Sequence, residues 1–258
     1  WEVVSTPHTV ELMPAEGSGC RNYQGPAWYR KYFVVPTATK GQRVLLHFEA
    51  AMGKQVLYLN GKRVQEHLGG YLPFTLDLTA NGVQAGDSCL LAVYTDNSND
   101  KSYPPGKPQY TLDFAYHGGI YRDVWMIAKS PVAITDAIDS RTVGGGGVFV
   151  HFDKISEKSA QVYVETEIQN NNRSESVTVE TTLTDAEGKV IKRTSSKLSL
   201  NSGEKKSIRQ QMDVRNPKLW SPDAPYLYRV QSRIKKGNRS IDGGTTRIGI
   251  RLAEFRGK

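Results

Sequence analysis

QVLYLNGKRVQEH, residues 55–67, is the stretch that decides the fold. Asn60 and Gly61 stand between two runs of residues that suit β-strands. Both residues of an Asn-Gly pair adopt positive φ readily, which the type I′ turn of a two-residue hairpin requires. The stretch therefore predicts an antiparallel β-hairpin.

Strand patterns flank this hairpin. VLLHFEAA (44–51) alternates, with Val44 and Phe48 on one face and His47 on the other. CLLAVYTDN (89–97) and RDVWMIA (122–128) predict further strands. Residues 97–109 between them are polar and contain three prolines, so they predict a long loop. Loops of that length in compact domains are often functional.

The character of the chain changes after Pro131, where Thr, Ser and charged residues become more frequent. About seven short strands follow at roughly ten-residue spacing, which is typical of an immunoglobulin-like sandwich. One pair is SVTVETTLTD and KVIKRTSS, predicted to join across residues 186–188. We find no apolar helical pattern of twelve or more residues. The predicted fold class is all-β, with two sandwiches.

Composition and charge limit the partners. Of the 258 residues, 23% are charged and 38% hydrophobic, as in ordinary soluble proteins. The sequence contains no run of eighteen apolar residues, so it predicts no transmembrane helix. Residues 1–130 hold 12 Lys and Arg against 11 Asp and Glu, and residues 131–258 hold 22 against 15. The basic residues of the second half are scattered, which favours a solvated sheet face over a nucleic-acid or membrane patch.

The number and spacing of the cysteines and histidines do not predict a metal or cofactor site. Cys89 alternates with Leu91 and Val93, which predicts a buried free thiol. A bridge between Cys20 and Cys89 would require an oxidising compartment. The five histidines are dispersed, without zinc-ligand spacing. We expect no metal and no cofactor in this segment.

Several longer stretches, taken together, resemble glycoside hydrolase family 2, most closely its β-galactosidase branch. They are NYQGPAWYRKYF (22–33), VLYLNGKRVQEHLGGYLPFTLDLT (56–79), YPPGKPQYTLDFAYHGGIYRDVWM (103–126), LWSPDAPYLYRV (219–230) and RIGIR (247–251). Their order and spacing match the first two domains of the family, and the resemblance covers nearly the whole chain.

The resemblance implies a jelly-roll sugar-binding domain at 1–130 and an immunoglobulin-like β-sandwich at 131–250. Residues 251–258 would be a stub leading to a (β/α)8 barrel that this chain lacks. In the family, two glutamates of that barrel perform retaining hydrolysis, which needs two carboxyl groups about 5 Å apart. We therefore expect an N-terminal portion of a longer glycosidase, inactive by itself.

Two residues are candidates for sugar contact through the resemblance. Asp113 lies six positions before Gly119, the offset at which the family's aspartate reaches the sugar, and a carboxylate binds hydroxyls strongly. Asn22 matches a second contact more loosely, because its loop differs in length. The alternatives are an Asx-turn aspartate and a plain turn asparagine.

Other conspicuous residues receive structural interpretations. Gly118 and Gly119 predict a tight turn that feeds a strand. Arg122 is expected to tie down a loop carbonyl or carboxylate rather than to contact sugar. Trp28 is expected in the core, the commoner place for a strand aromatic.

The resemblance implies the front of a β-galactosidase, which binds a β-galactoside together with the missing barrel. The alternatives are a free-standing carbohydrate-binding module, since jelly rolls serve as lectins, or the front of a β-glucuronidase or β-mannosidase. The stretch from PPGKP to LDFAYHGG favours galactoside. A homo-oligomer of the full-length enzyme is compatible with this picture, as is a periplasmic or secreted location.

Overall fold

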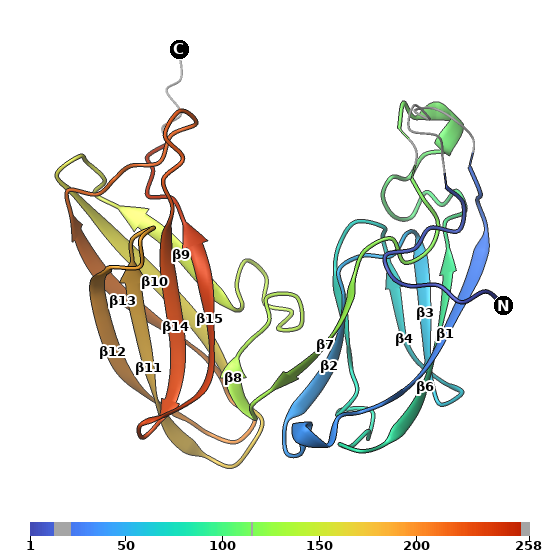
Figure 1. The fold of residues 1–258 in the computed structure, drawn as a ribbon, viewed down its shortest axis with the longest axis horizontal. Helices are drawn as coiled ribbons and strands as arrows, with labels where there is room; N and C mark the ends of the chain where they lie inside the picture. Colours follow the sequence, from blue (N-terminus) through green and yellow to red (C-terminus); the bar gives the residue numbers. More distant parts are fainter. Residues whose placement is uncertain (13–21, 115, 254–258) are drawn as a thin grey trace. The chain divides into compact units, whose positions relative to one another are not determined.

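A computed structural model describes residues 1–12, 22–114 and 116–253 of the chain. Within these ranges the chain forms β-strands and two short 3-10 turns, with no α-helix. It divides into two compact units, Trp1–Ala128 (unit 1) and Lys129–Lys258 (unit 2) (Figure 1). The all-β prediction is confirmed.

Unit 1 is a sandwich of two antiparallel sheets. One has the strand order β1-β6-β3-β4 and the other β5-β2-β7. The strands are β1 (Pro26–Val34), β2 (Arg43–Phe48), β3 (Lys54–Leu59), β4 (Lys62–Leu68), β5 (Phe74–Asp77), β6 (Ser88–Asp96) and β7 (Val124–Lys129). Apart from the β3–β4 hairpin, neighbours in each sheet are not consecutive in sequence, so the order is that of a jelly roll rather than of a simple meander.

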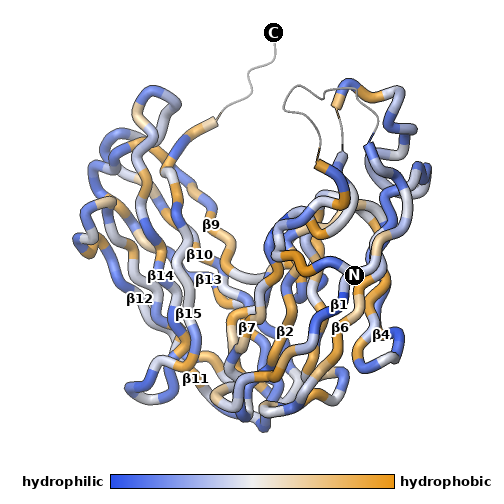
Figure 2. Tube along the Cα trace, turned by 45° about the vertical axis from the view of Figure 1, so that its right-hand side comes forward, coloured by the Kyte–Doolittle hydropathy of each residue, from blue (hydrophilic) through white to orange (hydrophobic). Residues whose placement is uncertain are grey.

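The core of unit 1 lies between these two sheets. Alternate residues of β2 and β6, including Leu46, Phe48 and Leu91, are buried in one hydrophobic cluster. Cys89 belongs to the same cluster as a free thiol, as predicted. Its proposed partner Cys20 lies outside the described residues. Hydrophobic residues concentrate along the strands in Figure 2, whereas many turns are hydrophilic.

The predicted hairpin is present. β3 and β4 pair antiparallel around Asn60 and Gly61, whose φ angles are 52° and 82°. The Asn60 side chain also accepts a hydrogen bond from the backbone amide of Leu90, 2.8 Å away on β6. The turn is thus tied to the neighbouring strand as well as to its own hairpin.

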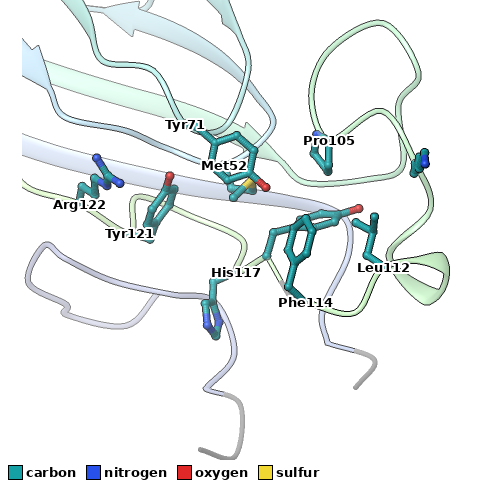
Figure 3. A pocket seen from close by; sticks show the side chains of 10 residues that line it. Met52, Tyr71, Pro105, Leu112, Phe114, His117, Tyr121 and Arg122 are labelled. Atoms are coloured by element: carbon teal, nitrogen blue, oxygen red, sulfur yellow. The ribbon is translucent and has the colours of Figure 1, made fainter. Parts of the chain in front are cut away.

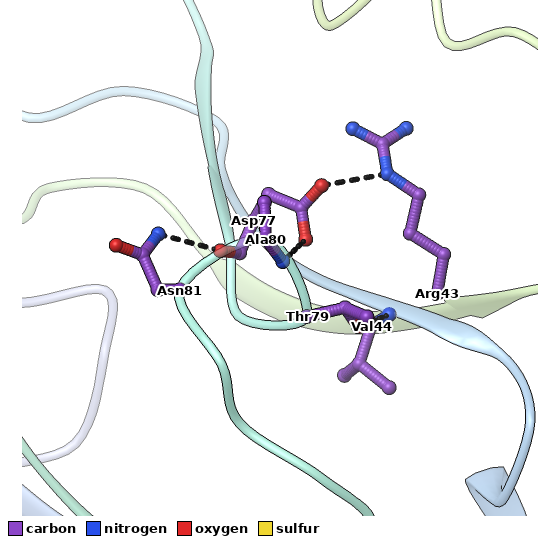
Figure 4. Close-up of polar contacts among 6 residues, drawn as sticks. All are labelled: Arg43, Val44, Asp77, Thr79, Ala80 and Asn81. Carbon is purple, nitrogen blue, oxygen red and sulfur yellow. Dashed lines mark hydrogen bonds and ion pairs between the residues drawn. The ribbon is translucent and has the colours of Figure 1, made fainter. Parts of the chain in front are cut away.

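A second turn, after β5, is organised by Asp77 (Figure 4). Its carboxylate accepts hydrogen bonds from Arg43 Nε at 2.7 Å and from the Ala80 amide at 2.8 Å. The backbone carbonyl of Asp77 accepts a third bond from Asn81 Nδ2, also at 2.7 Å. One side chain therefore closes the turn and links it to β2 of the same sheet.

The core prediction for Trp28 is wrong. Trp28 is 49% exposed, and the neighbouring Tyr29 and Phe33 are the β1 residues that pack on the core. Successive side chains of a strand point to opposite faces. Because Tyr29 points inward, Trp28 lies on the outer face of the sheet.

Unit 2 is a second sandwich. One sheet has the order β13-β10-β8, with β9 also paired to β10, and the other has β12-β11-β14-β15. The strands are β8 (Val132–Ile134), β9 (Val148–Asp153), β10 (Ser159–Asn170), β11 (Glu175–Thr184), β12 (Val190–Leu200), β13 (Lys205–Arg215), β14 (Tyr228–Lys236) and β15 (Arg239–Ile248). The β11–β12 pair forms as predicted, whereas the sequence patterns did not predict β8 and β9.

A polar link crosses the interior of unit 2. Thr181 Oγ1 on β11 donates a 2.6 Å hydrogen bond to Gln210 Oε1 on β13, in the other sheet. The Gln210 amide in turn donates to the Val179 carbonyl and to Ser196 Oγ, both at 3.1 Å. Buried polar groups need such partners. This arrangement fixes the position of one sheet against the other.

Candidate functional site

The long loop between β6 and β7 is held to the segment before β1 by a cluster of amide and phenol groups. Gln24 Nε2 donates to Gln109 Oε1 at 3.0 Å, to Tyr116 Oη at 3.2 Å and to Asn99 Oδ1 at 3.3 Å. The Tyr116 hydroxyl also donates to Asn99 Oδ1 at 3.0 Å. The loop is therefore tied at both ends of its polar stretch.

Asn97 makes a second tie between the same two segments. Its Nδ2 donates to the Tyr23 carbonyl at 2.8 Å, and its Oδ1 accepts from the Gly25 amide at 2.9 Å. The side chain is buried, with 2% of its surface exposed. Both halves of its amide are thus satisfied by the backbone that leads into β1.

Asn22, the looser of the two sequence-predicted site residues, reaches this same region. Its Nδ2 donates a 2.9 Å hydrogen bond to the backbone carbonyl of Tyr116. Its Oδ1 is buried without a hydrogen-bond partner among the described residues. Asn22 therefore holds the loop and keeps one acceptor unused.

Asp113, the other predicted residue, lies three positions before Tyr116 on an exposed part of the loop. Its neighbours Leu112 and Phe114 both line a cavity of about 640 Å³ in unit 1. The structure thus brings Asn22 and the Asp113 segment together, although 91 positions separate the two residues in sequence.

Aromatic and cationic side chains line this cavity (Figure 3). Tyr71 comes from the turn between β4 and β5, Tyr116 and Tyr121 come from the long β6–β7 loop, and Lys107, His117 and Arg122 contribute the basic groups. No Asp or Glu is among the described lining residues. A cavity with ring faces and hydrogen-bond donors suits a hydroxyl-rich or anionic ligand.

The tyrosines of the cavity are protonated at neutral pH. Burial raises the pKa of Tyr71, Tyr116 and Tyr121 above its ordinary value. The Tyr121 hydroxyl donates to the Gly70 carbonyl, which fixes its ring at the cavity. These groups therefore act as neutral hydrogen-bonding phenols.

The turn in YHGGIYRDVWM orients this wall. Gly119 has φ +103°, and a Cβ there would lie 2.2 Å from Tyr29 Oη, so glycine is required. Arg122 lines the cavity with its guanidinium 5.7 Å from the centre of the Tyr121 ring. Its expected bond to a loop carbonyl or carboxylate is not seen among the described residues.

No group of three or more metal-binding side chains occurs in the described ranges. Nor does any helix there have the length and apolar character needed to cross a membrane.

Two family models match the chain. Residues 6–131 match the sugar binding domain of glycosyl hydrolases family 2, and residues 146–251 match a second model of the same family. Together they cover most of both units. The chain belongs to glycoside hydrolase family 2.

Relatives in this family carry two kinds of name. A β-glucuronidase of Formosa agariphila is 33% identical over 99% of this chain and 27% of its own length. A β-galactosidase of Thermoanaerobacter pseudethanolicus is 34% identical, over 99% of this chain and 32% of its own length. The crystal structure of a Bacteroides uniformis β-glucuronidase superimposes with a TM-score of 0.84 at 27% identity, covering 97% of this chain and 29% of that one. The chain thus spans about a third or less of these family 2 relatives.

The sequence patterns did not predict most of the hydrogen bonds that hold the long loop beside the cavity. Gln24, Asn99 and Tyr116 were not singled out, and only the polar stretch 97–109 marked the loop as special. The contacts of Gln24 join positions 75 to 92 residues apart. No local pattern shows such pairs.

Proposed function

We propose that this chain is the non-catalytic, sugar-binding front of a retaining β-galactosidase, with Asp113 and Asn22 on one wall of the sugar site. The observation that carries the proposal is the hydrogen bond from Asn22 to the Tyr116 carbonyl, because it holds Asn22 against the loop that bears Asp113, and residues of that loop line the cavity. A carboxylate and an amide oxygen both accept hydrogen bonds from sugar hydroxyls well. The two catalytic carboxyls of the retaining mechanism are placed outside this chain.

A second candidate, a β-glucuronidase front, is favoured by the charge of the cavity. Lys107, His117 and Arg122 line it without an acidic side chain among the described lining residues. Such groups attract the carboxylate of a uronide, whereas Asp113 beside them would repel it. Relatives with both names fit these two candidates.

Kinetics of the parent enzyme test both candidates. The 258-residue chain alone should release no nitrophenol from nitrophenyl β-galactoside or β-glucuronide. In the full-length enzyme, Asp113→Asn should lower kcat/KM for the galactoside at least about 30-fold, a loss of roughly 2 kcal/mol. Arg122→Gln should leave galactoside turnover within about threefold.

The opposite pattern would favour the uronide. If Arg122→Gln abolishes glucuronide turnover and Asp113→Asn changes neither substrate, Asp113 is a turn residue and the galactosidase proposal fails. Turnover by the isolated chain would contradict the placement of the catalytic carboxyls.

A further inference from the structure

The outer face of the sheet β1-β6-β3-β4 carries a group of aromatic rings away from the cavity described above. Trp28 and Tyr94 are directly paired across β1 and β6, and Tyr58 lies in the adjacent row on β3. The Trp28 ring centre is 5.2 Å from that of Tyr94 and 5.7 Å from that of Tyr58. These three residues are termed the aromatic platform.

Water reaches this platform. Trp28 is 49% exposed, and Tyr32, four positions further along β1 on the same face, is 75% exposed. Tyr58 and Tyr94 are half-buried beside them. The inner face of the sheet is covered by the other sheet of the sandwich. Aromatic residues exposed together on one face mark interaction sites more often than isolated ones do.

Charged side chains surround the platform and are paired with one another. Lys54 lies 3.4 Å from Glu66, and Arg63 also contacts Glu66. Tyr94 Oη donates to Asp96 Oδ2 at 2.7 Å. These four charged residues sum to zero, and Arg30, between Trp28 and Tyr32 on the same face, adds one positive charge, so the face presents many polar groups and a small net charge.

This combination suits a neutral glycan. The apolar C–H face of a pyranose stacks on an aromatic ring, and its hydroxyls bond to groups at the rim. Such a ligand leaves the paired charges in water. A second copy of this chain would bury Lys54, Arg63, Glu66 and Asp96, which is costly unless each finds a new partner.

We propose that the aromatic platform is a second carbohydrate site, which holds an extended neutral glycan against Trp28, Tyr58 and Tyr94. It anchors a polysaccharide on unit 1 rather than presenting a bond for cleavage. None of its residues belongs to the Asn22–Asp113 region, so the two sites can be tested and can fail separately.

Native gel electrophoresis of the 258-residue chain in gels with soluble neutral polysaccharide (β-1,4-galactan or galactomannan) tests the proposal. We expect retardation that weakens at least tenfold in Trp28→Ala and partly returns in Trp28→Tyr. Trp125→Ala is the matched control, since Trp125 is 54% exposed on the other sheet. It and Asp113→Ala should bind like the unchanged chain. Thermal unfolding of Trp28→Ala checks its fold.

Retardation by neither polysaccharide overturns the proposal, as does unchanged binding by a folded Trp28→Ala. Sedimentation tests the rival occupant. A concentration-dependent dimer that Trp28→Ala abolishes, without retardation of the unchanged chain, would make this face an interface between copies. Loss of retardation in Asp113→Ala would assign the glycan to the cavity instead.

Discussion

At the scale of single residues, the sequence predicts the backbone preference of a residue but not which other residues surround it. The Asn60-Gly61 turn follows from backbone preference alone and is present as predicted. The usual packing of aromatics predicts a buried Trp28, but which face of a strand is buried depends on which of its alternating residues meet the partner sheet. Asn22 and Asp113 were found only through resemblance.

Gly119→Ala should lower the free energy of unfolding by more than Gly41→Ala. Both positions have positive φ, which costs a residue with a side chain about 1–3 kcal/mol. At Gly119 the new methyl would also meet Tyr29 Oη, which is held by His8, whereas nothing lies within 4 Å at Gly41. Urea unfolding of the two variants measures the difference. Equal losses would show that Tyr29 moves aside freely.

Tyr103 should make the fold sensitive to high pH. Burial, followed by the nearby charge of Asp100, raises the pKa of Tyr103 to about 12 from its ordinary value of 10.0. Below pH 10 both folded and unfolded states keep the proton, so the contribution is complete. Between about pH 10 and 12 only the unfolded state loses it, and stability falls.

Urea unfolding at pH 9, 10 and 11 checks this, with Tyr103→Phe as the comparison. The variant should lose less stability over this range, because it has no proton to lose. Parallel decline of both proteins would mean that other tyrosines account for the effect.

At the scale of elements, strands with a clean two-residue period were predictable and short ones were not. The β3–β4 hairpin and the β11–β12 pair follow from alternation and turn residues. β9 has only six residues after a glycine run, and β8 only three. Such strands exist because β10 offers them hydrogen bonds, which no local pattern reveals.

Asp77→Ala should destabilise unit 1 by about 2–3 kcal/mol, because it removes two hydrogen bonds of a charged group and leaves Arg43 without this carboxylate. Glu165→Ala is the comparison. Its pair with Arg209 is 3.7 Å long and the two side chains are 39% and 55% exposed, so its loss should cost under about 1 kcal/mol. Chemical denaturation of both variants gives the two values. Similar losses would show that the turn does not depend on Asp77.

At the scale of the whole molecule, the residues that the structure describes form separate hydrophobic cores, one cluster in unit 1 and two in unit 2. The change of texture near Pro131 lies close to the division between the units. The all-β class followed from periodicity, and the family followed from motifs spread over nearly the entire chain. The site could not be assembled this way, because its hydrogen bonds join distant positions.

Calorimetry should therefore show two unfolding transitions. Leu57→Ala, in the core of unit 1, should lower only one midpoint, and Leu183→Ala, in unit 2, only the other. Each removes a fully buried leucine, worth about 2–5 kcal/mol. A single transition that either variant shifts would show that the units unfold together.

Asn97 carries an implication for exchange of backbone protons with solvent. Its carboxamide accepts from one amide and donates to one carbonyl, as a peptide unit of a neighbouring strand would. The hydrogen-bond ladder between β1 and β6 is thus extended by one pair of bonds that a side chain makes. This pair lies where the loop that bears Asp113 begins. In deuterium oxide, the Gly25 amide should therefore exchange its proton as slowly as an amide within the β1–β6 ladder. The loop is then ordered at this end by folding itself, before any ligand binds at the cavity.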